Sequence, residues 1–186
     1  MTEQNCHKEP LIIVVMGVSG CGKSTIANEL AGLLGAHFKD GDELHPASNI
    51  EKMRTGIPLT DKDREPWLLD VAAYSKQQAK KYGACIVACS ALKNRYRQIL
   101  NQAGNVAYVF LHGSPELIAA GIHTRAGHFM PETLLSSQFA ALEDPRKEAN
   151  VVEVNIDSTI SNIAKGAAKK LKQHGIWPTD DIEISQ

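Results

Sequence analysis

Eight residues between an apolar run and a helical segment constrain this chain more than any other feature. They are Gly17, Val18, Ser19, Gly20, Cys21, Gly22, Lys23 and Ser24, directly after the apolar run 11–16. In such a loop the glycines let backbone N–H groups curl around phosphate oxygens, the lysine supplies a mobile cation, and the serine hydroxyl can ligate Mg²⁺. The strand pattern before the loop and the helical pattern after it disfavour a chance match. We therefore predict that residues 17–24, together with Thr25, bind a nucleoside triphosphate.

Candidate strands alternate with segments of helical spacing along the chain. The candidate strands are 11–16, 37–40, 84–90, 106–112 and 151–156. This alternation predicts a mostly parallel sheet with helices on both faces, and right-handed crossovers make the sheet doubly wound. With 186 residues and 43% apolar composition, residues 1–186 are expected to form a single α/β domain.

Three segments carry apolar side chains at helical spacing, and we expect these stripes to be buried. The first holds Ile26, Leu30, Leu33 and Leu34, the second, from near Arg64, holds Trp67, Leu68, Val71 and Ala72, and the last holds Ile160, Ile163, Ala164, Ala167, Ala168 and Leu171. The lysines of the last helix are expected to form a solvated face.

The charge balance limits the partners. The formal net charge is −1 and the pI is about 6.6, so the strongly basic face typical of nucleic-acid-binding proteins is not expected. No apolar run approaches the ~20 residues that a membrane span requires. The first ten residues lack the basic-then-apolar layout of a secretory signal. We expect a cytoplasmic protein with neither a nucleic-acid nor a membrane partner.

The four cysteines show no metal-binding spacing. They are Cys6, Cys21, Cys85 and Cys89, and reduced thiols are expected in the cytoplasm. Cys85 and Cys89 lie in an apolar stretch, so filling of the core is favoured over metal binding.

Motifs outside the phosphate-binding loop indicate which class of nucleotide-dependent reaction the chain catalyses. The third candidate strand carries no Asp or Glu where many ATPases and GTPases have one, and no N-K-x-D guanine signature occurs. Motor, transporter and switch GTPase functions are therefore disfavoured. The second strand instead ends in Asp40-Gly41-Asp42, where alternation sends both carboxylates to one side and the glycine lets the backbone bend beside a ligand.

If this strand lies beside the loop-bearing strand, Asp40 can steady Mg²⁺ and Asp42 can reach an acceptor hydroxyl. The alternative is an acidic turn that caps the next helix. A carboxylate pair would repel a nucleotide acceptor but accept hydrogen bonds from a polyhydroxylated one, so a sugar-like acceptor fits better.

Residues 45–68 are dense in polar and turn-forming residues and have too little apolar periodicity for a core element. We expect a mobile flap beside the sheet. Within it, Arg64 could hold an acceptor carboxylate in bidentate fashion. A surface ion pair with Asp61 or Asp63 is the alternative.

Taken together, the motifs closely resemble the small gluconokinases with a phosphate-binding loop. The matching residues are Gly17–Ser24, Asp40–Pro46, Asn49–Met53, Gly56–Leu59, Asp61–Leu68, Ser90–Lys93, Tyr96-Arg97 and Gly127–Pro131. The resemblance spans residues 11–145, and 40–68 is its most specific block. It implies ATP-dependent phosphorylation of D-gluconate to 6-phosphogluconate. It also implies a nucleoside monophosphate kinase- and shikimate kinase-like fold with strand order 2-3-1-4-5, a mobile lid and a homodimer.

The resemblance also implies roles for the matching residues. Lys23, Asp42 and Arg125 would be catalytic, Ser24 and Asp40 would hold Mg²⁺, and Asp40, Asp42, His45, Arg64, Lys93, Arg97 and His128 would bind the substrate. The flap and its helices would span about 43–82, and the lid about 121–140. The tail, 176–186, has no assigned role.

Two positions depart from the pattern. Gly121 stands where related kinases carry an arginine before the lid, so we expect weaker ATP contacts. Cys21 in the loop suggests an oxidant-sensitive thiol, because helix N-termini lower thiol pKa values. A shikimate-like small-molecule kinase and an ATP-binding regulatory protein with impaired catalysis are the alternative functions.

Overall fold

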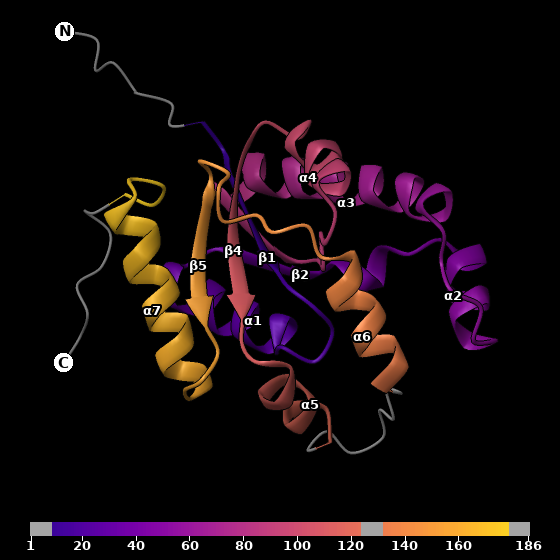
Figure 1. The fold of residues 1–186 in the computed structure, drawn as a ribbon. Coiled ribbons are helices and arrows are strands. Elements are labelled where there is room, and N and C mark those ends of the chain that lie inside the picture. The colour runs from indigo at the N-terminus through magenta and orange to yellow at the C-terminus, as the bar shows by residue number, and fades with distance from the viewer. Residues whose placement is uncertain (1–8, 124–131, 179–186) are drawn as a thin grey trace, which may run out of the picture.

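The computed structural model describes residues 9–123 and 132–178, which form a three-layer α/β fold (Figure 1). The strands are β1 (Leu11–Met16), β2 (His37–Asp40), β3 (Ala84–Ala88), β4 (Asn105–His112) and β5 (Val151–Asn155). All strand pairs are parallel, and the order is β2-β3-β1-β4-β5. The predicted strand order and doubly wound class are confirmed.

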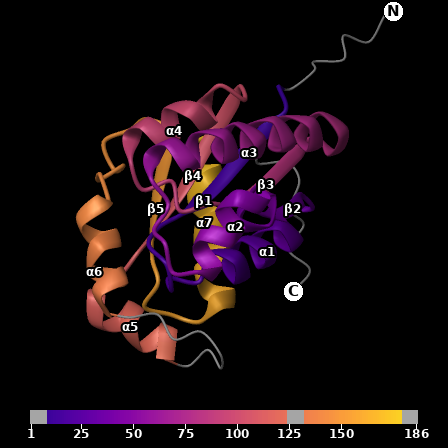
Figure 2. The same ribbon diagram turned by 90° about the vertical axis from the view of Figure 1, so that its right-hand side faces the viewer.

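Helices connect the strands and cover both faces of the sheet. They are α1 (Lys23–Leu34), the short 3₁₀ helix η1 (Gly41–Leu44), α2 (Ala47–Arg54), α3 (Asp61–Tyr82), α4 (Asn94–Asn101), α5 (Pro115–His123), α6 (Glu132–Ala141) and α7 (Ile160–Gln173). In Figures 1 and 2, α1 and α7 lie on one face of the sheet and α3 and α4 on the other.

Alternate residues of β1 supply two separate cores. Ile13 and Val15 pack toward α1 and α7, whereas Ile12 and Val14 pack toward α3 and α4. Because both faces are covered, every residue of β1 is buried. This double burial explains why the strand reads as a continuous apolar run.

The expected stripes are mostly buried. Leu33 and Ile160 are the exceptions, with 37% and 46% of their surface exposed. Each lies at the border of an apolar stripe, where helical spacing alone does not separate buried from exposed positions. Cys85 and Cys89 are buried as expected, and burial raises the pKa of Cys85 to about 11.

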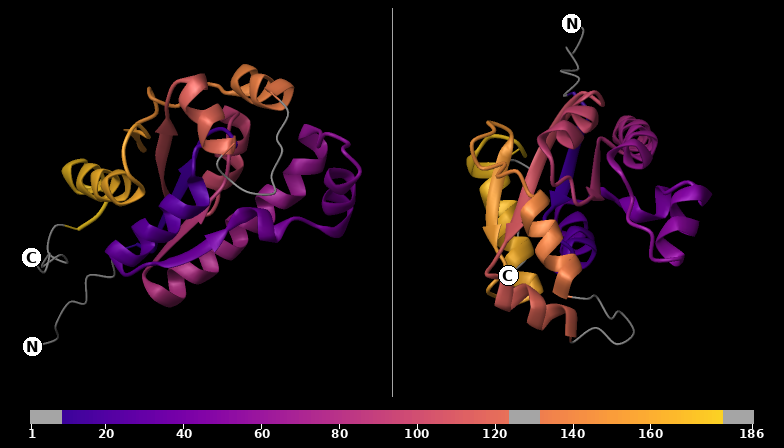
Figure 3. Two further views of the ribbon diagram at one scale, coloured as in Figure 1. Left: turned by 90° about the horizontal axis from the view of Figure 1, so that it is seen from below. Right: turned by 45° about the vertical axis from the view of Figure 1, so that its right-hand side comes forward.

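The flap prediction was partly wrong. Residues 45–68 contain α2 and the first turns of α3, and Trp67 and Leu68 belong to the core beneath α3. A capping box between Thr60 and Asp63 starts α3, with Pro66 tolerated near its N-terminus. Figure 3 shows that α2 protrudes from the body of the domain. Among the described helices, none is long and apolar enough to cross a membrane.

Candidate active site

The candidate site lies at the carboxyl ends of β1, β2 and β3. The loop from β1 to α1 contains the predicted nucleotide-binding residues, and Asp40 ends β2. The condition that β2 lies directly beside β1 is not met, because β3 lies between them, in agreement with the strand order that the resemblance implies. The N-terminus of α1 nevertheless reaches the end of β2, so that the two motifs meet.

The loop conformation depends on glycine. Gly20 and Gly22 have φ values of +87° and +89°, and a Cβ on Gly17 would lie 2.6 Å from the carbonyl oxygen of Leu111. Lys23 begins α1, and its Nζ donates to the carbonyl oxygen of Val18 at 3.1 Å. The ammonium group therefore folds back over the loop, which is where a bound phosphate would need a cation.

One short hydrogen bond joins the loop to the acidic motif. Ser24 Oγ donates to Asp40 Oδ2 at 2.5 Å, and Asp40 Oδ1 accepts from the backbone N–H of Asp42 at 3.0 Å. Asp40 therefore caps η1, as the structural alternative expects, and also contacts the serine of the loop. The Asp40 carboxylate therefore both caps η1 and binds the phosphate-binding loop.

This pair fits a magnesium ion. Hydroxyl and carboxylate oxygens are hard donors, and Mg²⁺ in phosphate-transfer sites is commonly held by one or two protein groups together with phosphates and water. The described residues contain no cluster of three or more His, Cys, Asp or Glu side chains that could hold a metal on its own. Ser24 and Asp40 would leave the other coordination positions of a Mg²⁺ ion to phosphate oxygens and water.

Gly41 separates the two carboxylates for a steric reason. A Cβ at this position would lie 2.6 Å from the carbonyl oxygen of Ala88 in β3. The glycine thus permits close packing against the neighbouring strand, whereas the sequence had suggested bending beside a ligand.

We expect Gly41→Ala to lower the free energy of unfolding by ~1–3 kcal/mol, because the backbone of η1 must move away from β3. Gly32→Ala is the matched control, since nothing lies within 4 Å of a Cβ built at Gly32 in α1. The control should gain up to ~1 kcal/mol of helix stability. Urea unfolding of both variants measures the difference, and an unchanged Gly41→Ala would contradict the close approach.

Asp42 projects into solvent beside the loop, with 81% of its side chain exposed. Partial desolvation by the surrounding protein and the nearby Asp40 carboxylate raise the pKa of Asp42, whereas Lys23 and Arg64 oppose the shift. Because the side chain itself is open to water, we regard the repulsion by Asp40 as the firmer cause. An acceptor hydroxyl can reach this carboxylate directly.

His45 is buried next to Asp42. Its ring stacks on Trp67 with centroids 4.1 Å apart, and its Nε2 lies 3.9 Å from Asp42 Oδ1. Burial and the neighbouring Arg64 lower the pKa of His45 to about 4. The imidazole is therefore neutral at physiological pH.

Arg64 lies on the same side of the site. Within the described residues it forms no ion pair with Asp61 or Asp63, so the alternative of a surface ion pair is not realised. Asp61 instead pairs with Lys93 and Arg95, and Asp63 pairs with Lys52. Arg64 acts electrostatically on both Asp42 and His45, a position suited to an anionic acceptor.

Lys93 is held by Asp61, with Nζ–Oδ distances of 2.9 and 3.1 Å. The hydrogen bond from Tyr96 and then that from Lys93 lower the pKa of Asp61 to about 2. Lys93 is nevertheless partly exposed, and substrate could share it.

The prediction that Arg97 binds the substrate is not supported by its surroundings. Only 1% of it is exposed, and its donors bind Glu148 and the carbonyl oxygens of Ala91, Leu92 and Glu143. All five guanidinium N–H groups thus have internal partners. Arg97 stabilises the turn after β3 and has no N–H group left over for an acceptor.

Other sequence-based hypotheses have mixed outcomes. Cys21 is 3% exposed, so the structure argues against an accessible, reactive thiol. A Cβ at Gly121 would lie 3.4 Å from the carbonyl oxygen of Gly20, which places this position against the loop. Arg125 and His128 lie outside the described residues.

Sequence reasoning missed two contributors to the site. Gln138 in α6 accepts from the Ser19 backbone N–H at 2.6 Å and donates to Ser19 Oγ at 2.7 Å. Asn49 in α2 is 2% exposed and contacts His45. No sequence pattern near Gln138 indicates its contact with Ser19, whereas Asn49 is the first residue of the gluconokinase-like motif 49–53.

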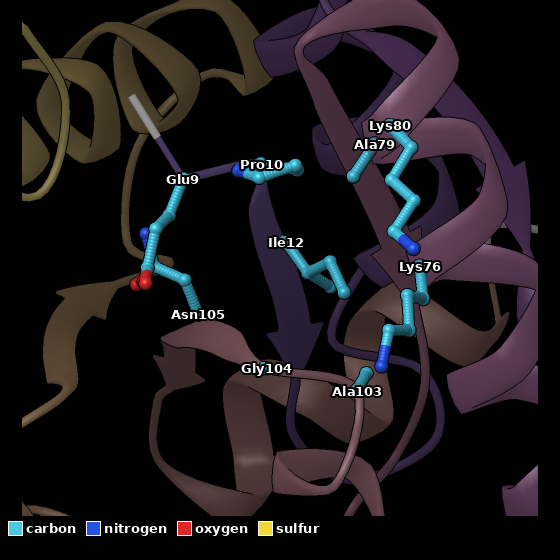
Figure 4. Close-up of a pocket in the computed structure, with 9 residues that line it drawn as sticks. All are labelled: Glu9, Pro10, Ile12, Lys76, Ala79, Lys80, Ala103, Gly104 and Asn105. Atoms are coloured by element: carbon cyan, nitrogen blue, oxygen red, sulfur yellow. The ribbon is translucent and has the colours of Figure 1, made fainter. Parts of the chain in front are cut away.

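Cavities also occur at the opposite end of the sheet. One of about 230 Å³, shown in Figure 4, is lined by residues that include Ile12, Lys76, Lys80 and Asn105. These residues lie at the amino-terminal ends of β1 and β4 and along α3. None of them belongs to the predicted site.

Comparisons with known proteins agree with this geometry. Residues 19–172 match a family model described as shikimate kinase. A protein named thermosensitive gluconokinase from Escherichia coli (strain K12) is 47% identical over 156 residues, covering 82% of each chain. A gluconokinase from Gluconobacter oxydans (strain 621H) is 45% identical over 158 residues, covering 83% of this chain and 89% of that protein. The crystal structure of a gluconokinase from Sinorhizobium meliloti 1021 has a TM-score of 0.79 at 45% identity, covering 89% of this chain and 94% of that one.

Proposed function

Because this chain belongs to the gluconokinases, a family of shikimate kinase-like fold, we propose that it transfers the γ-phosphoryl group of ATP to D-gluconate and forms 6-phospho-D-gluconate. The observation that carries the proposal is the 2.5 Å hydrogen bond between Ser24 and Asp40. It joins the nucleotide loop to the turn that presents Asp42. The gluconokinase relatives support gluconate as the acceptor.

The nucleotide half of the site would use the loop. Backbone N–H groups of residues 20–24 at the N-terminus of α1 would hold the β-phosphate, and Lys23 would follow the γ-phosphoryl group. Ser24 and Asp40 would hold Mg²⁺, which when bound neutralises phosphate charge. Positioning and electrostatic stabilisation supply most of the rate enhancement in such reactions.

The acceptor half would use the acidic turn and α3. Asp42 would orient the terminal hydroxyl of gluconate and accept its proton late in the transfer. Arg64 would bind the gluconate carboxylate, because a guanidinium matches a carboxylate with two parallel hydrogen bonds. His45 and Lys93 would border the sugar, while Arg125 and His128 would act from the lid.

The proposal also covers the oligomeric state of the protein and its location in the cell. We infer a homodimer from the resemblance to gluconokinases, and a cytoplasmic location where ATP is available. Light scattering coupled to size-exclusion chromatography would measure the assembly, and a monomeric mass would refute the dimer.

A coupled ADP-release assay tests the function. The acceptors are gluconate, shikimate, other aldonates and nucleoside monophosphates, each with and without Mg²⁺. Turnover that depends on gluconate and Mg²⁺ is expected. Turnover only with another acceptor, or ATP binding without turnover, would overturn the proposal and favour a related kinase or a regulatory protein.

Position 121 offers a gain-of-function test. We expect Gly121→Arg to lower the KM for ATP or to raise kcat, because a side chain here projects toward the loop carbonyl of Gly20. Gly166→Arg in α7 is the control, since a Cβ there contacts nothing within 4 Å. Both variants remove a helix glycine, but only Gly121→Arg should alter kinetics. Steady-state kinetics at varied ATP concentration measure KM and kcat for both variants. Equal values for the two variants would contradict the assignment of position 121 to the ATP site.

A further inference from the structure

The buried residues behind Asp42 form a connected polar chain. Asn49 Nδ2 lies 2.9 Å from the backbone carbonyl oxygen of Asp63 and 3.3 Å from His45 Nδ1. The Asn49 side chain sits in α2, while Asp63 lies in the first turn of α3. His45 and Asn49 are buried although most of α2 is exposed. Burying this polar pair, one member of which lies on the protruding α2, is costly unless its hydrogen bonds are made.

The contacts of Asn49 determine the position of the imidazole proton. A backbone carbonyl oxygen can only accept, so the Asn49 atom facing Asp63 must be the amide nitrogen. That nitrogen has two hydrogens and no lone pair to accept with, so in its 3.3 Å contact with His45 Nδ1 it acts as the donor. His45 Nδ1 must therefore accept, which places the proton of the neutral ring on Nε2.

The orientation of the ring is also restrained. His45 stacks on Trp67 with an interplanar angle of 16°, and Trp67 Nε1 donates to the carbonyl oxygen of Gly41 at 2.8 Å. Trp67 thus ties the imidazole plane to the turn that separates the two carboxylates. His45 Nε2 lies 3.9 Å from Asp42 Oδ1, which is beyond hydrogen-bond distance, and a rotation of the exposed Asp42 side chain would be needed to bring the two atoms together.

We propose that Asn49 is a positioning residue that holds His45 in the Nε2–H tautomer, so that a neutral imidazole orients the Asp42 carboxylate for the acceptor hydroxyl. The role of Asp42 rests on the proposed function, whereas the tautomer does not. A neutral imidazole can donate a hydrogen bond to Asp42 Oδ1. A charged imidazolium at the same place would stabilise the carboxylate more strongly and make it a weaker base. The second carboxylate oxygen then remains available to the hydroxyl.

The first test measures the tautomer in the full-length protein without substrate. Long-range ¹⁵N–¹H NMR of the imidazole rings, with His45 assigned by the loss of its signals in His45→Gln, should show the proton on Nε2. In Asn49→Asp the carboxylate would accept from Nδ1, so the Nε2–H signature should be lost. A wild-type His45 protonated on Nδ1, or a tautomer unaffected by Asn49→Asp, would overturn the proposal.

The second test compares two replacements of His45 by kinetics. The amide nitrogen of Gln can occupy the place of Nε2, whereas that of Asn reaches only the place of Nδ1. Both lose the ring stack on Trp67, so their thermal stabilities should fall alike. We expect kcat of His45→Gln to exceed that of His45→Asn by roughly 10-fold or more, the effect of a hydrogen bond to a charged group.

Equal kcat values for the two variants would mean that His45 acts through packing alone and would refute the positioning role. If wild-type protein failed to phosphorylate gluconate, the proposed function would fall, but the NMR result would still report whether Asn49 sets the tautomer. The two failures are therefore distinguishable.

Discussion

Asp42→Asn is expected to lower kcat for gluconate phosphorylation by about 10²- to 10⁴-fold, the range typical of a lost general base. The amide keeps the shape of the side chain but cannot accept the proton of the hydroxyl. Asp42 lies outside the loop that holds the nucleotide, so affinity for ATP should change little. Steady-state kinetics and calorimetric titration with a non-hydrolysable ATP analogue measure the two quantities.

Glu43→Gln is the matched control for this prediction. Glu43 follows Asp42 in η1, but its carboxylate is 60% exposed and pairs with Lys39. The control should retain wild-type kcat. A loss of less than about tenfold in Asp42→Asn would contradict the assignment of a general base.

Arg97→Met is expected to lower the free energy of unfolding by about 3–5 kcal/mol, because it removes the guanidinium that neutralises the partly buried Glu148 and donates to three carbonyl oxygens. Glu148 and the Leu92 carbonyl oxygen each keep one other donor, from Asn94 and from the Glu143 backbone N–H. For a chain of this size the melting temperature should fall by on the order of 10 °C. Differential scanning calorimetry measures this change.

Arg95→Met is the control on the same helix. Arg95 is 52% exposed and pairs with Asp61 and Glu65, so its loss should cost less than ~1 kcal/mol. If Arg97 bound gluconate, its variant would show a raised KM at temperatures where the protein is folded. An unchanged melting temperature together with such a raised KM would restore the substrate-binding role predicted from the sequence.

The strands and the phosphate-binding loop were predictable because their signals are local. A strand buried on both faces reads as a continuous apolar run, and the loop requires glycines at positions that residues with a Cβ cannot occupy. β1 and β2 accordingly have their predicted bounds, and the acidic motif lies at the expected end of its strand.

The roles of the basic residues were not predictable in the same way. Arg64, Lys93 and Arg97 all lie in motifs shared with gluconokinases, yet their surroundings differ. Arg64 acts electrostatically on Asp42, Lys93 pairs with Asp61, and Arg97 is buried. The partner of Arg97, Glu148, is 51 residues away along the chain, and no local pattern indicates such a pairing. The same holds for Gln138, which contacts Ser19 across 119 residues.

The sequence by itself determined the kind of fold, the nucleotide loop and the pair of carboxylates that follows β2, since each depends on the conformational limits of a few neighbouring residues. Only the tertiary structure decided that Ser24 meets Asp40 across β3, that His45 is buried and neutral beside Asp42, and that Arg97 is buried among internal partners. These outcomes depend on burial and on long-range partners. Desolvation and hydrogen bonding set the charge and direction of a side chain, and both arise only when distant segments pack together.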